Sequence, residues 1–290
     1  MTTSTQLRDV LNAAIQQLGH SSTDSARLDA EVLLAHVLDK QRVYLLTWPE
    51  QALNDEQRAR YQQLVSRRLQ GVPIAYLTGT REFWSLALTV SSDTLIPRPD
   101  TETLVSIALQ KLPGNHGQRI CDLGTGSGAI ALALASERPD CELLATDISA
   151  ASLKIAMQNA TQLGLKNVRF QQSDWFSALA EQPFELIVSN PPYIAIQDPH
   201  LTQGDVAHEP HQALISGPEG LDDLLKIASV AQDYLCPTGW LLMEHGWQQA
   251  EDTRSLLLEQ GYQNVSSWQD ETGNMRVSGG QRPTDSVKNR

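Results

Sequence analysis

The tetrapeptide Asn190-Pro191-Pro192-Tyr193 has the residue types needed to hold a planar –NH2 group. The Asn190 side-chain oxygen and the Pro191 backbone carbonyl can each accept one of its two N–H bonds. The Tyr193 ring can pack on the plane of the bound group. With both hydrogens held, the nitrogen lone pair is directed at an electrophile opposite, so the motif predicts chemistry at an amine or amide nitrogen.

The position of this motif predicts a rigid site. It directly follows an apolar run, residues 184–189, which is typical of a buried strand. Neither proline can donate to a sheet ladder and both fix φ, so the strand must end abruptly. We therefore expect a stiff loop at the carboxyl end of this strand, with all four residues in contact with the substrate.

A second motif predicts a nucleotide-binding turn that seats the electrophile. Residues 119–123 are typical of a strand, residues 124–128 read Gly-Thr-Gly-Ser-Gly, and the alanine-rich residues 129–135 favour a helix. Missing side chains in such a turn let the backbone approach a ligand closely. We assign to cofactor binding the residues Asp122, Gly124, Thr125, Gly126, Ser127 and Gly128, and also Asn190 from the first motif. Asp122 has an alternative role, because a strand-end aspartate can simply cap the turn.

Asp147 is the candidate ribose ligand. It ends the predicted strand 141–146 and lies 147 − 124 = 23 residues beyond Gly124, the spacing at which a carboxylate takes ribose hydroxyls. Glycine turn and carboxylate together fit both NAD and S-adenosylmethionine. Asn190 and its neighbours distinguish the two, because a hydride-transfer enzyme has no use for an –NH2 clamp and a methyl-transfer enzyme does.

The carboxyl-terminal part alternates strands and helices. The predicted strands are 119–123, 141–146, 168–172, 184–189 and 239–244, and residues 262–269 and 276–279 could form a terminal antiparallel pair. This pattern predicts a doubly wound α/β fold with its site at the carboxyl ends of the parallel strands. Polar or aromatic residues end successive strands there: Asp122, Asp147, Asp174-Trp175 and Asn190.

The amino-terminal part reads as a separate small all-α domain. Helices are predicted at residues 7–18, 26–38, 43–47 and 54–69, with Ser22, Thr23 and Asp24 as capping candidates for the second. We expect residues 1–73 to form a helical substrate-docking domain, residues 74–96 a β-hairpin linker, and residues 97–290 the catalytic domain.

Composition limits the class of partner. The 290 residues carry a net charge of −12, which argues against stable binding of nucleic acid. No apolar run is long enough to span a bilayer and no apolar leader is evident, so we expect a cytoplasmic protein that binds no membrane. The three cysteines lack metal spacing and are interpreted as reduced core thiols. We expect a monomer and no metal.

Several motifs in order resemble one known family. They are Gly71-Val72-Pro73-Ile74-Ala75-Tyr76-Leu77-Thr78-Gly79, Glu82-Phe83-Trp84, the segment 96–102, the segment 122–128, Asp174-Trp175-Phe176, Asn190-Pro191-Pro192-Tyr193 and Asp270-x-x-Gly273-x-x-Arg276-Val277. Together they resemble the PrmC/HemK family, the protein-(glutamine-N5) methyltransferases that modify peptide chain release factors. The resemblance runs from about residue 7 to about residue 280.

The resemblance implies a helical amino-terminal domain and a seven-stranded, Rossmann-like class I methyltransferase domain. It also implies S-adenosylmethionine as methyl donor, with Trp175 bordering its adenine, and the glutamine of a Gly-Gly-Gln tripeptide in release factors as substrate. Trp175 has the alternative of ordinary core packing. Two rival functions stay open: an N6-adenine methyltransferase acting on DNA or RNA, which uses the same clamp, and a non-enzymatic factor that docks on release factors or ribosomes.

Four further features have competing interpretations. Arg98 could brace the domain junction through a carboxylate or lie near the active site. The stretch 208–211, His-Glu-Pro-His, invites a metal site, but proline interrupts it, and a loop closing over the substrate is preferred. Arg67-Arg68 could be a solvated face or a docking surface. The chain's own Gly279-Gly280-Gln281 raises self-methylation, for which chance is the better explanation.

Overall fold

The computed structural model describes residues 6–20, 25–112, 114, 117–180 and 183–284. The chain divides into two compact units, one of residues 1–80 with 199–208, and one of residues 81–198 with 209–290. The predicted capping candidates Ser22, Thr23 and Asp24 lie outside the described residues.

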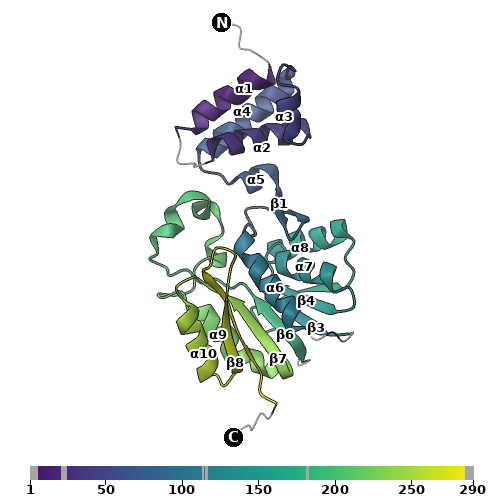
Figure 1. Cartoon of the computed structure of the whole chain (residues 1–290), viewed down its shortest axis with the longest axis vertical. Coiled ribbons are helices and arrows are strands. Elements are labelled where there is room, and N and C mark those ends of the chain that lie inside the picture. Colours follow the sequence, from purple (N-terminus) through teal and green to yellow (C-terminus); the bar gives the residue numbers. More distant parts are fainter. Residues whose placement is uncertain (1–5, 21–24, 113, 115–116, 181–182, 285–290) are drawn as a thin grey trace. The chain divides into compact units, whose positions relative to one another are not determined.

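The first unit is a small helical bundle (Figure 1). Its α-helices are α1 (Leu7–Leu18), α2 (Ala26–Leu38), α3 (Val43–Thr47), α4 (Asp55–Leu69) and α5 (Ile74–Thr78), and the 3-10 helices η2 (Pro199–Thr202) and η3 (Gly204–His208) join it from later in the chain. Helix α4 begins with a capping box in which Asn54 and Gln57 satisfy each other's backbone N–H groups. The apolar faces of α1, α2 and α4 enclose one core, so the helical part predicted from periodicity is confirmed.

The predicted linker is partly helical. Residues 74–78 form α5, which follows Pro73 and ends at Gly79 with φ +74°. The hairpin is shorter than predicted and consists of β1 (Thr80–Phe83) and β2 (Leu86–Thr89). Its two turn residues, Trp84 and Ser85, both have positive φ, as a tight two-residue hairpin turn with the right twist requires.

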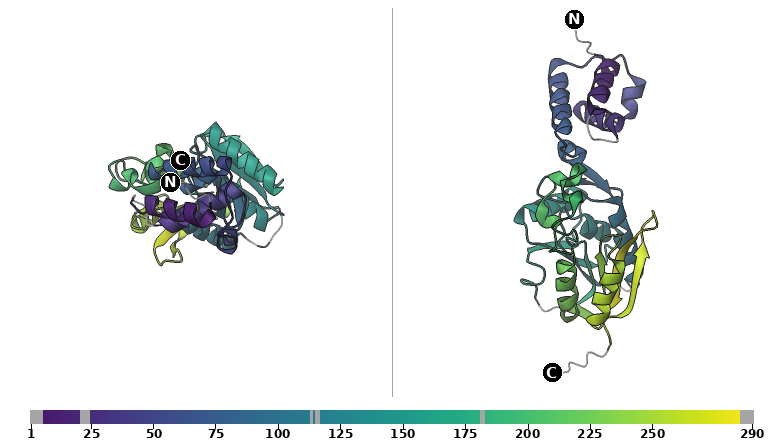
Figure 2. Two further views of the ribbon diagram at one scale, coloured as in Figure 1. Left: turned by 90° about the horizontal axis from the view of Figure 1, so that it is seen from above. Right: turned by 90° about the vertical axis from the view of Figure 1, so that its left-hand side faces the viewer.

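The second unit is a seven-stranded sheet covered by helices on both faces. The strands are β3 (Arg119–Leu123), β4 (Glu142–Asp147), β5 (Val168–Gln172), β6 (Phe184–Ser189), β7 (Leu235–Glu244), β8 (Gln263–Gln269) and β9 (Met275–Gln281). Their order is β5-β4-β3-β6-β7-β9-β8, and β9 runs antiparallel to both of its neighbours while the other neighbouring pairs are parallel. The predicted fold is confirmed, including the terminal antiparallel pair, drawn in yellow in Figure 2.

The helices and the two hydrophobic cores follow from strand alternation. In β6, Leu186 and Val188 belong to one core and Ile187 to the other, since successive side chains point to opposite faces. The helices are η1 (Pro99–Thr101), α6 (Glu102–Lys111), α7 (Ala129–Glu137), α8 (Ala150–Leu163), η4 (His211–Ala213), α9 (Asp222–Tyr234) and α10 (Ala250–Glu259). Helices α6 to α8 cover one face, and α9 and α10 the other (Figure 1).

The topology gives the sheet one switch point. Strand β3 pairs with β4 on one side and with β6 on the other, so the chain crosses over in opposite directions from it. Crevices outside the carboxyl ends of strands at such a point bind ligands. All three cysteines are free thiols; Cys121 and Cys141 are buried, in agreement with their interpretation as core thiols, whereas Cys236 is only partly buried. In the described part of the chain, every helix is too short or too polar to cross a membrane.

Candidate active site

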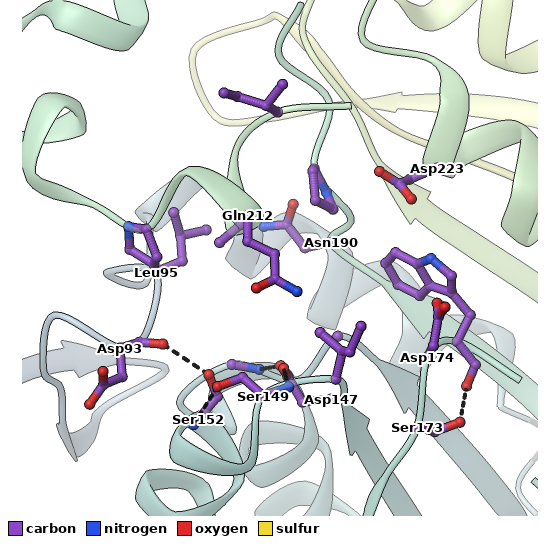
Figure 3. Close-up of a pocket in the computed structure, with 18 of the residues that line it drawn as sticks. Asp93, Leu95, Asp147, Ser149, Ser152, Ser173, Asp174, Asn190, Gln212 and Asp223 are labelled. Carbon is purple, nitrogen blue, oxygen red and sulfur yellow. Dashed lines mark hydrogen bonds between the residues drawn. The ribbon is translucent and has the colours of Figure 1, made fainter. Parts of the chain in front are cut away.

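A cavity of about 570 Å³ opens at the carboxyl ends of β3 to β6 (Figure 3). Its lining comes from the glycine turn after β3, the ends of β4 to β6, the segments 92–95 and 210–215, and the first turns of α8 and α9. This volume is within the range of pockets that enclose a ligand of nucleoside size. The cavity contains Gly124, Gly126, Asp147, Trp175, Asn190 and Pro192, so the structure brings half of the twelve residues predicted for the site to one surface.

The glycine turn adopts conformations that favour glycine. Gly124, Gly126 and Gly128 have φ values of +72°, +56° and +88°. Gly128 also lies against α7 and α8, where a Cβ atom would meet Leu132 Cδ1 at 3.0 Å and Ala156 Cβ at 3.2 Å. Gly128 therefore positions the helix, while Gly124 and Gly126 line the cavity.

Asp122 supports the turn from beneath. The residue is 1 % exposed and does not line the cavity. Its Oδ2 accepts hydrogen bonds from Thr125 Oγ1 at 2.6 Å and from the Ala131 N–H at 3.1 Å. Burial raises the pKa of Asp122 to about 7. With these two hydrogen bonds Asp122 caps the turn, which is the alternative role considered for it. Thr125 and Ser127 are also buried behind the turn.

Asp147 ends β4 and faces the cavity. Its two carboxylate oxygens accept the N–H groups of Gly126 and Ser149, each at 2.8 Å. Each oxygen keeps a lone pair, so the carboxylate can accept two further hydroxyl groups, as a ribose diol presents. Burial raises the pKa of Asp147, whereas the backbone N–H groups act in the opposite direction.

Trp175 combines the two roles considered for it. Its ring lies against Gly124, where a Cβ atom would meet Trp175 Cζ3 at 3.4 Å, and it packs on the core beneath α9 while lining the cavity. Its backbone has φ +48°, a conformation that is strained for a side chain of this size. Ser173 holds it, because Ser173 Oγ donates to the Trp175 carbonyl at 2.8 Å.

The Asn190 amide is anchored on its nitrogen side. Asn190 Nδ2 donates to Thr101 Oγ1 at 3.3 Å, which leaves Oδ1 to accept from a ligand in the cavity. Pro191 is buried and Pro192 lines the cavity. Tyr193 lies outside the lining: its ring packs on the core and Oη lies 3.5 Å from Glu244 Oε1.

Comparisons with known proteins agree with this geometry. The PrmC N-terminal domain family matches residues 9–79, and a methyltransferase domain family matches residues 115–281. The release factor glutamine methyltransferase of Salmonella typhimurium is 53% identical over 270 residues, which cover 93% of this chain and 96% of that one. That of Escherichia coli is 52% identical over 268 residues, covering 92% and 96%.

The chain belongs to the release factor glutamine methyltransferase family. The resemblance seen in the motifs is thereby confirmed. A solved methyltransferase from Pyrococcus furiosus shares the fold, with a TM-score of 0.53 and 18% identity, covering 79% of this chain and 100% of that one. The family's amino-terminal domain match falls within the helical unit. The methyltransferase match falls within the sheet unit except for residues 199–208, which belong to the helical unit.

The sequence missed three residues that support the clamp in this methyltransferase: Thr101, Glu244 and Gln249. Gln249 Nε2 donates to the carbonyls of Tyr193 at 3.1 Å and Gly220 at 3.2 Å, and its Oε1 accepts from the Gly246 N–H. Glu244 ends β7 at the same edge as Asn190, so its place at the end of a strand was the available signal. Thr101 ends η1 within the segment 96–102 that carries the family resemblance, but no pattern indicated its contact with Asn190.

Arg98 braces a loop of the catalytic unit. It forms an ion pair with Glu209, a buried carboxylate that also accepts from the Ile96 N–H at 3.2 Å. Next to it, Pro210 lines the cavity. Among the residues that the structure describes, no cluster of His, Cys, Asp and Glu suits a metal ion. The ion pair between Arg98 and Glu209 agrees with the bracing interpretation of Arg98.

The remaining candidates have structural roles. In the helical unit, Arg68 is largely buried and pairs with Asp29 and Asp205, each at 2.8 Å, so it fastens η3 to α2 and α4. Gln281 lies in β9 opposite Trp240, which pairs with Leu186 near the amino end of β6, whereas Asn190 follows the carboxyl end of β6. Its amide bonds Thr238 and Asn264. This placement separates Gln281 from the clamp within its own chain.

Proposed function

We propose that the chain transfers a methyl group from S-adenosyl-L-methionine to the side-chain nitrogen N5 of the glutamine in the Gly-Gly-Gln motif of peptide chain release factors, modulating translation termination. The observation that carries this is the anchored amide of Asn190, whose nitrogen is engaged by Thr101 and whose oxygen can accept from a substrate –NH2 group. The relatives' name, release factor glutamine methyltransferase, supports the substrate.

The lining of the cavity fits the methyl donor. Gly124 and Gly126 have no side chains to obstruct a ligand, Asp147 offers two lone pairs to ribose hydroxyls, and Trp175 offers an aromatic wall. Asp122, Thr125, Ser127 and Gly128 act by shaping the turn. When bound, S-adenosylmethionine supplies a methyl group on a positively charged sulfur.

The chain's own residues make the amide nitrogen reactive. An amide nitrogen is a poor nucleophile because its lone pair is delocalised into the carbonyl. Asn190 Oδ1 and the Pro191 carbonyl each accept one N–H bond, which directs the lone pair toward the methyl donor, while Pro192 and Tyr193 fix the loop. Positioning and electrostatics then supply most of the rate. The proton becomes acidic only as the new bond forms, so it can leave to water.

The organisation of the chain fits a protein substrate. We propose that residues 1–73 dock the release factor, that residues 74–96 link the two domains, and that residues 97–290 catalyse the methyl transfer. The acidic chain, with a net charge of −12, lacks the excess of basic residues that stable binding of nucleic acid favours. The chain is proposed to act in the cytoplasm, where release factors work, as a monomer.

A labelling experiment tests this function. The protein is incubated with methyl-labelled S-adenosylmethionine and a release factor, either wild type or with the Gly-Gly-Gln glutamine replaced by alanine, with DNA in a parallel tube. Label on the wild-type factor alone supports glutamine methylation. Label on DNA supports the N6-adenine alternative, and label on neither release factor rejects the proposed substrate.

A further inference from the structure

We propose that Glu244 is a positioning residue that fixes the Asn190 amide, together with Thr101, in the one orientation that presents Oδ1 to the substrate. The inference rests on the proposed function, because it concerns the same clamp. It assigns a role to a buried carboxylate that ends β7 and that none of the sequence motifs includes.

The register of the sheet places Glu244 beside the clamp. Ser189 at the end of β6 pairs with Met243 in β7, so Asn190 and Glu244 are the next residues along two adjacent parallel strands. Glu244 is 1 % exposed. Its Oε1 lies 3.5 Å from Tyr193 Oη, and the Thr101 and Asn190 side chains lie close enough to stabilise its ionised form by hydrogen bonding.

Hydrogen-bond chemistry makes this arrangement directional. A primary amide has donors on its nitrogen and acceptors on its oxygen, and the two ends have nearly the same shape. An ionised carboxylate can only accept, so beside Glu244 the amide nitrogen of Asn190 must face inward, where Thr101 Oγ1 also accepts it at 3.3 Å. Oδ1 is then left for the substrate. Without the carboxylate, the reversed amide, which cannot accept a substrate N–H bond, becomes comparably stable.

Stability does not account for this carboxylate. Although the Thr101 and Asn190 side chains lie near the Glu244 carboxylate, no donor among the described residues meets its buried Oε2 in full hydrogen-bond geometry. A buried carboxyl group with an unmatched oxygen costs folding free energy that an apolar residue of similar volume avoids. A role in orienting the clamp explains why such a group lies beside Tyr193 and Asn190.

The charges around Glu244 make the orientation sensitive to pH. Burial raises the pKa of Glu244 to about 7; Asp100 acts in the same direction, and Arg276 lowers it. Arg276 on β9 itself pairs with Asp100 at 3.0 Å and Asp270 at 3.2 Å. Tyr193 faces Glu244 from the loop after β6, and His245, next along the chain, bonds Ser278 instead. The clamp should therefore become ordered as Glu244 ionises near neutral pH.

The test compares three variants with the wild type in the release-factor methylation assay. Glu244→Gln can turn its own –NH2 group toward Asn190 and favour the reversed amide, so kcat should fall roughly tenfold or more. Affinity for S-adenosylmethionine should not change, and the melting temperature should not fall, because the variant removes a buried carboxyl group whose pKa is raised. Thr101→Val should lower kcat and Thr101→Ser should restore it. The wild-type kcat should rise with pH through neutrality, and that rise should be absent in Glu244→Gln.

Glu185→Gln is the matched control. Glu185 lies on β6 but accepts the Arg119 N–H at 2.7 Å at the other edge of the sheet, so its variant should keep the wild-type kcat and pH profile. A Glu244→Gln enzyme with wild-type kcat and pH profile overturns the inference. So does a variant that loses cofactor affinity and melting temperature in parallel with kcat. If the wild type itself does not methylate the release factor, the proposed function fails instead.

Discussion

Asp147 Oδ2 accepts the backbone N–H of Gly126 at 2.8 Å, which joins the end of β4 to the turn that follows β3. The left-handed φ of Gly126, +56°, belongs to the turn conformation in which this N–H meets the carboxylate. Since Oδ1 is held by the Ser149 N–H at 2.8 Å, the carboxylate is fixed before any ligand arrives. The glycine turn and the carboxylate that we propose as the ribose ligand therefore form one preorganised structure.

Replacing Asp147 with asparagine should weaken binding of the methyl donor. The new amide nitrogen would face the N–H of either Gly126 or Ser149, so one bond from a fixed backbone donor is lost along with the negative charge. Hydrogen bonds to charged groups contribute about 1.5–3 kcal/mol, so the Kd for S-adenosylmethionine should rise roughly tenfold to a hundredfold in calorimetric titration. Asp55→Asn, at a carboxylate that is 94% exposed on α4, is the control. Unchanged affinity in Asp147→Asn would reject the ribose assignment.

Replacing Asn190 with alanine should affect catalysis far more than cofactor binding. The change removes the acceptor that holds the substrate amide, and the loss of one preorganised polar group typically lowers kcat by about 10²–10³. Single-turnover methylation and calorimetry on the same preparation separate the two effects. Asn190→Asp keeps an acceptor but places a second carboxylate beside the buried Glu244, so it should also be slow. Equal losses of kcat and affinity would contradict the clamp.

Much of the fold could be predicted because the signals are local. Strand β6 is an apolar run that ends at two prolines, and the turn 124–128 combines glycines with a helix-forming alanine run. The short helix 74–78 was missed within the predicted hairpin, because five residues give too little periodicity to distinguish a helix from a strand. The motifs likewise located Asp147, Trp175 and Asn190, which lie at the carboxyl ends of their strands or within three residues of them.

The missed parts of the site depend on long-range contacts. Thr101 meets Asn190 across 89 residues of sequence, and Gln249 reaches the Tyr193 carbonyl across 56. Their spacing along the chain follows from strand order and loop length, which residue patterns specify weakly. Asp122 shows the converse: its position at a strand end suggested ligand contact, whereas its side chain turns inward and caps the turn. Strand ends indicate which edge carries the site, but not which side chains enter the cavity.

Gly220→Ala should destabilise the catalytic unit by more than the backbone strain of placing alanine at a positive φ. Gly220 has φ +78°, and a Cβ atom there would lie 2.3 Å from the Tyr193 carbonyl oxygen. Gly164→Ala is the matched control, since Gly164 has φ +70° and open space around it. The control should lose roughly 1–2 kcal/mol of unfolding free energy, and Gly220→Ala at least about twice that in urea titrations. Equal losses would show that the loop moves aside without cost.

Removing Arg98 should cost more stability than neutralising its partner Glu209. The Glu209 side chain is 0% exposed and the Arg98 side chain 32%, so the arginine can reach water and the carboxylate cannot. Arg98→Ala leaves a buried charge without its cation, a loss of about 3–5 kcal/mol. Glu209→Gln keeps an acceptor for the Ile96 N–H and should cost less. Urea titration of both variants checks the order, and the reverse order would contradict it.

Asp122 should make stability depend on pH in the direction opposite to that of a salt-bridged aspartate. Burial, and next to it the charge of Asp147, raise the pKa of Asp122 from its ordinary value of 3.8 to about 7. Between these values the folded chain binds more protons at this site than the unfolded chain. The free energy of unfolding from Asp122 is therefore highest at low pH and falls as the pH rises through this window, by at most about 1.4 kcal/mol per unit.

Asp122→Asn isolates that contribution. The amide oxygen can still accept from Thr125 and Ala131, and the amide nitrogen replaces Oδ1, which is buried without a partner among the described residues. The unfolding free energy of Asp122→Asn minus that of the wild type should increase between pH 4 and about pH 7 and be level above it. In the Asp147→Asn background the increase should end at lower pH, since one neighbouring charge is gone. A difference independent of pH would mean that Asp122 is ionised throughout.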